Sequence, residues 1–228
     1  MDTISLKVIA RIYNDYSHKF GIPRQSGLNE ETLSTIVFEK DYRSENALRD
    51  IENFSHLWLL WYFSQNENKS WSPCVRPPRL GGNKRTGVFA TRSPFRPNPI
   101  GLSSVKLIKK EKTKDGIVLI VQGADILSGT PILDIKPYIK YTDCHVDAIS
   151  SFADDCKDYH LNVVFDDNLL KILPIEKQKA VIEILKNDPR PSYQNDNRLY
   201  GMIYGGYEIK FTVNNSTLTV MQVAKSND

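Results

Sequence analysis

The segment from Arg85 to Ser103 combines charged side chains with an unusually stiff backbone. Three prolines between positions 94 and 99 fix the φ angle and reduce the entropy that the loop loses on ordering. Arg92 and Arg96 lie on this loop, and a preorganised site needs its charged groups held in place in this way. The segment therefore predicts a site built around two guanidinium groups. The alternative is a stiffened crossover whose arginines are solvated.

The charged residues are segregated along the chain, although the net charge is only +3. Between Arg76 and Lys114 there are eleven basic residues and one acid, Glu111. Between Asp143 and Asp167 seven aspartates accompany a single lysine. A basic stretch attracts phosphates, so the segregation predicts a polyanionic partner. The alternative is a solvated surface on which the two stretches cancel in space.

Several chemistries are not supported by the motifs. No GxGxxG follows a strand, and the P-loop pattern GxxxxGK[ST] and the nucleophile pattern GxSxG do not occur. Cys144, His145, Cys156 and His160 are close in sequence, but zinc sites seldom use adjacent ligands and this spacing matches no usual pattern. We therefore expect no metal.

Length and composition describe a folded chain outside the membrane. Of the 228 residues, 40% are hydrophobic and 25% are charged, which suits one large domain or one domain with a small appendage. The longest apolar run, 57–63, is far shorter than the roughly 20 residues of a membrane span. The first residues lack an apolar signal region, and three cysteines without a CxxC pair indicate reduced thiols. We expect a cytoplasmic protein.

The segment 85–103 is here called the arginine loop. The elements that must position it are mostly strands. The continuous apolar run 57–63 is typical of a strand buried on both faces, and a helix is expected near Ser44, where a serine can cap it. So many strands with so little helix predict a barrel or a highly curved sheet rather than a Rossmann sheet. The predicted strands are 3–13, 33–38, 57–63, 101–108, 116–121 and 131–138.

The pattern changes after an acidic connector over 143–158. A strand over 161–165 and a helix over 174–186 with an apolar stripe precede a final hairpin, 200–213 with 218–223. We therefore predict a barrel domain over 1–145 and a small α+β domain over 157–228.

Four motifs in this order closely resemble the TsaA/TrmO family. They are KFGIPRQ at 19–25, the arginine loop at 85–103, GADILSGTPILDIKPY at 123–138, and DPRPSY at 188–193 continuing to Tyr200 and Gly201. The resemblance covers nearly the whole chain. It implies a tRNA methyltransferase on a single-sheet β-barrel that uses S-adenosylmethionine and acts as a homodimer. The substrate it implies is N6 of threonylcarbamoyladenosine at position 37, beside the anticodon of threonine tRNA.

The resemblance also implies a cofactor site. Arg24 or Arg92 would hold the methionyl carboxylate, Leu102 would pack on the adenine, and the backbone of the 125–128 turn would bind the polar edge of the adenine. Where the family usually has Asp-Gly-Thr, this chain has Ser128-Gly129-Thr130, so a contact through that carboxylate would be lost. The implied cofactor residues are Pro23, Arg24, Gln25, Ser64, Gln65, Arg92, Leu102, Asp125, Ile126, Leu127 and Ser128.

The acceptor nitrogen is attached to a carbonyl and is a poor nucleophile, so removal of its proton during attack is expected. The sequence does not identify a single residue as the base. The candidates are Asp125, Asp134, Tyr138 and Asp196. Arg190 or Arg198 would pair with the threonyl carboxylate. Tyr193 and Tyr200 would stack on loop bases. For Tyr200, packing in a core or hairpin is the alternative.

Two other functions remain open on sequence alone. One is a non-catalytic RNA-binding module of the same fold, for which Ser128 is the only indication. The other is a methyltransferase that acts on another acceptor.

Overall fold

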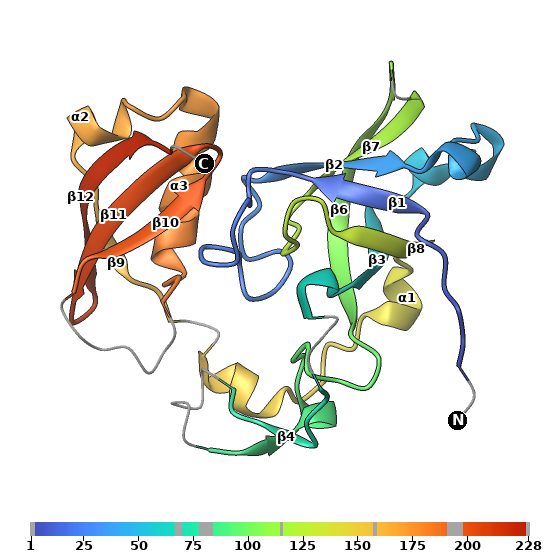
Figure 1. Cartoon of the computed structure of the whole chain (residues 1–228), viewed down its shortest axis with the longest axis horizontal. Coiled ribbons are helices and arrows are strands. Elements are labelled where there is room, and N and C mark those ends of the chain that lie inside the picture. The colour runs from blue at the N-terminus through green and yellow to red at the C-terminus, as the bar shows by residue number, and fades with distance from the viewer. Residues whose placement is uncertain are drawn as a thin grey trace.

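The computed structural model of the protein describes residues 3–66, 70–77, 84–114, 116–156, 159–190 and 198–226. Figure 1 shows two bodies joined by long connections: blue and green strands on one side, and an orange and red sheet with its helix on the other. A small two-stranded sheet, β4 (Cys74–Val75) with β5 (Thr86–Gly87), lies below them. None of the helices described has the length and apolar composition that a membrane span needs.

Six antiparallel strands form a closed barrel in the order β1-β2-β7-β6-β3-β8. Ala10 of β1 pairs with Ile132 of β8, which joins the two ends of the sheet. The longest strand, β6, pairs with β3 on one side and β7 on the other. The strands are β1 (Ala10–Tyr13), β2 (Leu33–Phe38), β3 (His56–Tyr62), β6 (Ile100–Thr113), β7 (Gly116–Gln122) and β8 (Pro131–Pro137).

Side chains alternate along these strands between the barrel core and the outside. In β3, Leu57, Leu59 and Trp61 are buried, whereas Trp58 and Leu60 face outward and are half-buried. The prediction that this run is buried on both faces was therefore wrong. An antiparallel strand needs to cover only one face, and aromatic residues fit the outer one as well.

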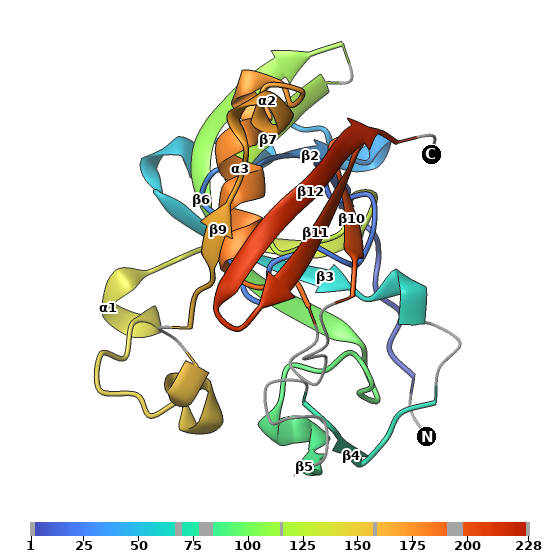
Figure 2. The same ribbon diagram turned by 90° about the vertical axis from the view of Figure 1, so that its left-hand side faces the viewer.

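The second body, here called the C-terminal unit, contains a four-stranded sheet in the order β10-β11-β12-β9. Its first three strands are antiparallel, and β9 pairs with β12 in parallel. It has its own core, which contains Val181 and Leu185 of its main helix and Ile209 and Phe211 of β11. Its elements are β9 (Asn162–Val164), α2 (Asp167–Leu170), α3 (Ile175–Lys186), β10 (Tyr200–Tyr204), β11 (Tyr207–Asn214) and β12 (Thr217–Lys225). In Figure 2, α3 lies behind this sheet.

The loop over residues 14–32, between β1 and β2, connects the two bodies. Tyr16 of this loop is 1% exposed and belongs to the core of the C-terminal unit. The Tyr16 hydroxyl lies 3.0 Å from Thr32 Oγ1, which lies 3.0 Å from the hydroxyl of Tyr204. Asn29 donates to the Thr32 hydroxyl and, at 3.2 Å, to the carbonyl of Ala180 on α3. We call these side chains the polar cluster; they join the barrel to the C-terminal unit.

The mainly β prediction is confirmed, with differences in detail. No long helix follows Ser44; 3-10 helices occupy 40–42, 46–48 and 51–53 instead. The strand predicted over 3–13 is ordered as a strand only over 10–13. The predicted strand 200–213 is two strands, because Gly205 and Gly206 have positive φ angles and form a turn. A short helix, α1 (Lys140–Asp143), ends where the acidic connector begins, and a 3-10 helix occupies 151–156 within the connector.

Candidate functional site

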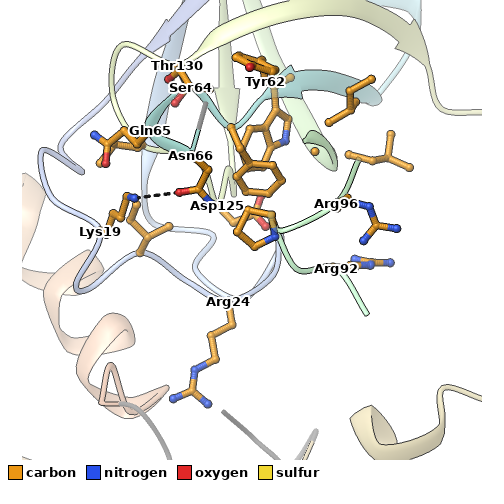
Figure 3. Close-up of a pocket in the computed structure, with 18 of the residues that line it drawn as sticks. Lys19, Arg24, Tyr62, Ser64, Gln65, Asn66, Arg92, Arg96, Asp125 and Thr130 are labelled. Atoms are coloured by element: carbon orange, nitrogen blue, oxygen red, sulfur yellow. Dashed lines mark hydrogen bonds between the residues drawn. The ribbon is translucent and has the colours of Figure 1, made fainter. Parts of the chain in front are cut away.

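A cavity of about 590 Å³ opens at one end of the barrel. This volume lies within the range of small-molecule sites, about 300–1,000 Å³. Its walls come from five segments of the chain: 19–25, 61–66, 91–96, 100–102 and the stretch from Asp125 to Thr130. Figure 3 labels side chains from 19–25, 61–66, 91–96 and the Asp125–Thr130 stretch around it. We call it the barrel-end cavity.

Nine of the eleven residues implied as cofactor ligands line the barrel-end cavity. They are Pro23, Arg24, Gln25, Ser64, Gln65, Arg92, Leu102, Asp125 and Leu127. They meet because the arginine loop, the 14–32 loop and the end of β3 all lie at the same rim of the barrel.

Ile126 and Ser128, which the resemblance also implies as cofactor residues, do not line the cavity. Ile126 is fully buried in the barrel core. The Ser128 hydroxyl accepts a hydrogen bond from the backbone N–H of Asn14 at 3.2 Å, and its own N–H donates to the carbonyl of Tyr16. Successive side chains of this turn point to opposite sides, so only Asp125 and Leu127 reach the cavity. Ser128 anchors the end of β1 instead.

The cavity lining is rich in cations. Lys19, Arg24, Arg92 and Arg96 line it, and Asp125 is the single carboxylate among the lining residues that the structure describes. Figure 3 shows both Arg92 and Arg96 on the loop that follows the small two-stranded sheet. Arg96 supports its own loop, because its guanidinium donates to the carbonyl of Thr91 at 2.7 Å. Arg92 is exposed and donates to the side-chain oxygen of Gln25.

Arg24 contributes to two places at once. Its stem lines the barrel-end cavity, and its guanidinium extends away from it, as Figure 3 shows. The guanidinium donates to the carbonyl of Asp188, at 3.1 Å, and to that of Arg190, both in the C-terminal unit. A small crevice between the two bodies shares Ile22, Pro23 and Arg24 with the larger cavity. In this arrangement Arg92 is better placed than Arg24 to bind an anion in the cavity.

Ser103 and Trp61, which were not among the sequence-based candidates, hold the Asp125 carboxylate in place through hydrogen bonds. The Ser103 hydroxyl donates to Asp125 Oδ1 at 2.5 Å, and the Trp61 indole N–H donates to Ser103 Oγ at 3.0 Å. Burial raises the pKa of the Asp125 carboxyl, and the Ser103 hydrogen bond opposes this rise. A serine at an inward position of β6 was the available sequence signal, because a buried hydroxyl needs a partner.

The other candidate bases lie elsewhere. Asp134 is on β8 and forms an ion pair with Lys136 at 2.8 Å, and it does not line the cavity. Tyr138 packs against Trp58 on the outside of the barrel, with ring centroids 5.5 Å apart. Asp196 lies outside the described residues.

The candidate tRNA contacts are placed unequally. The Arg190 side chain is 6% exposed and pairs with Asp188 at 2.9 Å, and Tyr159 donates to the same carboxylate at 3.1 Å. This burial favours a structural role over an open contact to substrate. Tyr200 is 5% exposed and stacks on Phe211, which favours the packing alternative.

Among the candidate tRNA contacts that the structure describes, Arg198 is the one at the surface. Its side chain is exposed, and its guanidinium carbon lies 4.9 Å from the centre of the Tyr200 ring. Tyr193 lies outside the described residues.

Two family models match the chain. The model of the tRNA-methyltransferase O N-terminal domain matches residues 11–144, and that of the TrmO C-terminal domain matches residues 158–226. Together with the mainly β fold, these matches define the class of protein as a tRNA methyltransferase.

Individual relatives agree with this class. The tRNA (adenine(37)-N6)-methyltransferase of Escherichia coli is 40% identical over 200 residues, which cover 85% of each chain. A putative S-adenosylmethionine-dependent methyltransferase of Pseudomonas aeruginosa is 37% identical over 209 residues, 88% of each chain. A crystal structure of TrmO from P. aeruginosa superimposes with a TM-score of 0.80 at 30% identity, covering 99% of both chains. The chain belongs to the tRNA-methyltransferase O family, which confirms the resemblance seen in its motifs.

Proposed function

We propose that the protein transfers the methyl group of S-adenosylmethionine to N6 of adenosine 37 in tRNA, and that the preferred acceptor is threonylcarbamoyladenosine in threonine tRNA. One observation carries the proposal. In a chain of this family, five separated segments meet around a single cavity that combines cations, apolar surface and one carboxylate. The relative from E. coli has a name that states the same position and atom.

The cavity suits the proposed cofactor. S-adenosylmethionine supplies an activated methyl group on a sulfonium, together with a carboxylate and an adenine. The exposed Arg92 guanidinium can bind the carboxylate through two parallel hydrogen bonds. Leu102 and the rings of Phe63 and Phe95 offer apolar surface for the adenine, and the backbone of the turn at Asp125 and Leu127 lies beside them.

The protein's part in the reaction is alignment and exclusion of water. Methyl transfer is an in-line displacement, so donor and acceptor must be held at a short distance and a fixed angle. The proline-stiffened arginine loop and the rim of the barrel provide fixed walls for this. The apolar side chains of Phe95 and Leu102 in the cavity lining would limit the access of water once donor and acceptor are bound.

Within this proposal the chain has two domains, 1–145 and 157–228, and the second recognises the tRNA. Separate hydrophobic cores and two adjoining family matches support the division. Arg198, exposed above Tyr200, is the described residue best placed to meet the threonyl carboxylate or a phosphate. Arg190 instead supports the turn from inside. Free thiols at Cys74 and Cys144 suit the cytoplasm, where a tRNA enzyme would work.

We also propose that the enzyme is a homodimer. Ile100 and Leu102 at the start of β6 are 36% and 53% exposed and adjoin the cavity, and a second subunit would cover such apolar side chains. Light scattering of the purified protein would give the mass in solution. A monomer at micromolar concentration would contradict this part of the proposal.

Mass analysis of tRNA nucleosides tests the reaction. A strain that lacks the gene should lose N6-methylated threonylcarbamoyladenosine and accumulate the unmethylated form. Loss of a different methylated nucleoside would show another acceptor. Calorimetry with S-adenosylmethionine separates the enzyme from a non-catalytic RNA-binding module, because the module would not bind the cofactor.

A further inference from the structure

A hydrogen-bonded chain runs from the barrel core to the floor of the barrel-end cavity. The Trp61 indole donates to Ser103 at 3.0 Å, and Ser103 donates to Asp125 at 2.5 Å. Trp61 is 8% exposed and Ser103 1%. The serine thus uses its one proton for Asp125 and accepts from the indole. Because a buried hydroxyl is costly when unpaired, this arrangement fixes the direction of all three groups.

The strand register explains how Trp61 reaches Ser103. Trp61 on β3 is the cross-strand partner of Gly101 on β6. A Cβ atom built on Gly101 would lie 2.2 Å from the indole ring, so only glycine lets the ring lie flat over the strand. Two residues further along the same face of β6, Ser103 then receives the indole N–H. Both inward positions of Gly101-Leu102-Ser103 therefore contribute to the hydrogen-bonded chain. Gly101 leaves room for the indole ring, and Ser103 accepts the indole N–H.

The charges facing Asp125 are mostly positive. Arg92 acts on it from the arginine loop, and Lys19, Arg24 and Arg96 line the same cavity. The hydroxyl of Tyr16 is near enough to sense the Asp125 charge and is itself neutral, because burial raises its pKa to about 12. The side chains that hydrogen-bond to Asp125 are neutral. Neutral donors orient a carboxylate with less loss of basicity than a bonded cation would cause.

We propose that Asp125 is the group that accepts the N6 proton of the adenine, and that Ser103 and Trp61 are positioning residues that aim its carboxylate. This inference rests on the proposed function. As the bond from N6 to the methyl carbon forms, the bond from that carbon to sulfur breaks and the sulfur keeps the electron pair. The N6 proton passes to an Asp125 carboxylate oxygen, so the products are a neutral thioether, a methylated nitrogen and a protonated Asp125.

The location of Asp125 distinguishes it from the other candidates. It is the one described carboxylate on the cavity wall, whereas Asp134 is paired with Lys136 outside the cavity. The elevated pKa of the Asp125 carboxyl agrees with a role as base, since a base works best when its pKa approaches the working pH.

The first test is Asp125→Asn, which keeps shape and removes the base. Single-turnover methylation of tRNA at saturating S-adenosylmethionine should fall by about 10²-fold or more, the usual effect of a general base. Cofactor affinity by calorimetry should stay within about threefold of the wild type. A large loss of affinity that explains the lost activity would overturn the proposal, because Asp125 would then be a cofactor ligand. An unchanged rate would overturn it as well.

The second test separates positioning from folding through the pH profile. The Ser103 hydrogen bond lowers the pKa of Asp125, so Ser103→Ala should raise that pKa. The acid limb of the single-turnover rate should then move to higher pH, and Ser103→Thr, which keeps a hydroxyl, should restore its position. Trp61→Phe, which removes the indole donor together with part of the ring, should give a smaller shift in the same direction.

Ser104→Ala is the matched control. Ser104 is the next residue on β6, is half-buried and does not line the cavity, so its loss should leave the profile in place. A slower Ser103→Ala enzyme whose acid limb does not move would show a structural role only. If the wild type itself transfers no methyl group to any tRNA, the proposed function fails. If it does and Asp125→Asn is as fast, only the assignment of the base fails.

Discussion

Arg92, Arg24 and Arg190 have the same side chain and different surroundings. Arg92 is exposed and bonded to Gln25, Arg24 reaches across to carbonyl groups of the C-terminal unit, and Arg190 is buried against Asp188. Burial and partner, rather than residue type, therefore decide which of them is available to a ligand. Different substitution effects follow for each.

Arg92→Ala should weaken the binding of S-adenosylmethionine and leave the fold intact. Losing a charge-assisted hydrogen bond costs about 2 kcal/mol, which is more than tenfold in affinity. Calorimetry measures the affinity and circular dichroism the fold. Arg49→Ala is a suitable control, because Arg49 is exposed and bonds to Asn46 away from the cavity. Equal affinities for the two variants would argue against a role of Arg92 in binding the cofactor.

Arg190→Ala should lower stability, since it leaves the buried Asp188 carboxylate without its cationic partner. Breaking a buried pair from one side costs about 3–5 kcal/mol, and urea denaturation would show it as an earlier midpoint. Arg198→Ala, at an exposed position beside the same tyrosine, should change stability little. A stable Arg190→Ala protein that methylates tRNA poorly would instead favour direct contact with the substrate.

The sequence motifs identified many residues that line the cavity, but not the side chains that hydrogen-bond to Asp125 from the barrel core. Nine of the implied ligands line one cavity because the motifs bring their loops to the same rim. The direction of Ile126 and Ser128 depends on how a turn alternates, which the motif does not encode. The chain from Trp61 through Ser103 to Asp125 joins residues 42 and 22 positions apart. Such pairs depend on strand register, and periodicity alone does not give register between distant strands.

At the scale of elements, alternation and turn residues decided which predictions held. Strands over 33–38, 116–121 and 131–138 were close to those observed. The helix expected at Ser44 fails because Asp50 adopts a left-handed φ of 65°, which interrupts any regular helix, and short helices are costly to nucleate. The turn at Gly205 and Gly206 was visible in the sequence as a Gly-Gly pair, the usual signal for a two-residue hairpin.

Gly101→Ala should disrupt the contact between β3 and β6. The added methyl group would lie 2.2 Å from the Trp61 ring and would force it away from Ser103. Such overpacking costs about 1–3 kcal/mol, seen as a lower melting temperature. Gly87→Ala is the control, because nothing lies within 4 Å of a Cβ atom there. Equal melting temperatures for the two variants would mean that the ring can shift without cost.

At the scale of the whole molecule, the polar cluster makes the two bodies one structural unit. The hydroxyls of Tyr16 and Tyr204 each bond to that of Thr32, and Asn29 links this group to α3. Beside them Lys177 pairs with Asp15 at 2.6 Å. Unfolding either body would expose these groups without their partners, so we expect a single cooperative transition.

Stability should fall as the pH rises from 10 to 12. Burial raises the pKa of Tyr16 to about 12 and also raises that of Tyr204, so both hydroxyls stay protonated in the folded protein while the unfolded chain ionises near pH 10. The contribution of these hydroxyls to the free energy of unfolding is therefore complete below pH 10 and is lost as the pH rises above it. For Tyr16 it amounts to about 2–3 kcal/mol. Urea midpoints between pH 9 and 12 would measure the slope, and Tyr16→Phe should flatten it. A slope unchanged by the substitution would contradict this origin.

The loop over residues 14–32 has a consequence for how the family diversifies. Its first half inserts Tyr16 into the C-terminal unit, its middle supplies Pro23 and Gln25 to the cavity wall, and its end anchors Thr32 beside β2. An inserted or deleted residue would displace at least one of these contacts. Over evolutionary time this segment should therefore keep a constant length among relatives that retain both bodies, while the exposed end of the β6–β7 hairpin should accept insertions. Loop lengths compared across many such relatives would reveal the difference.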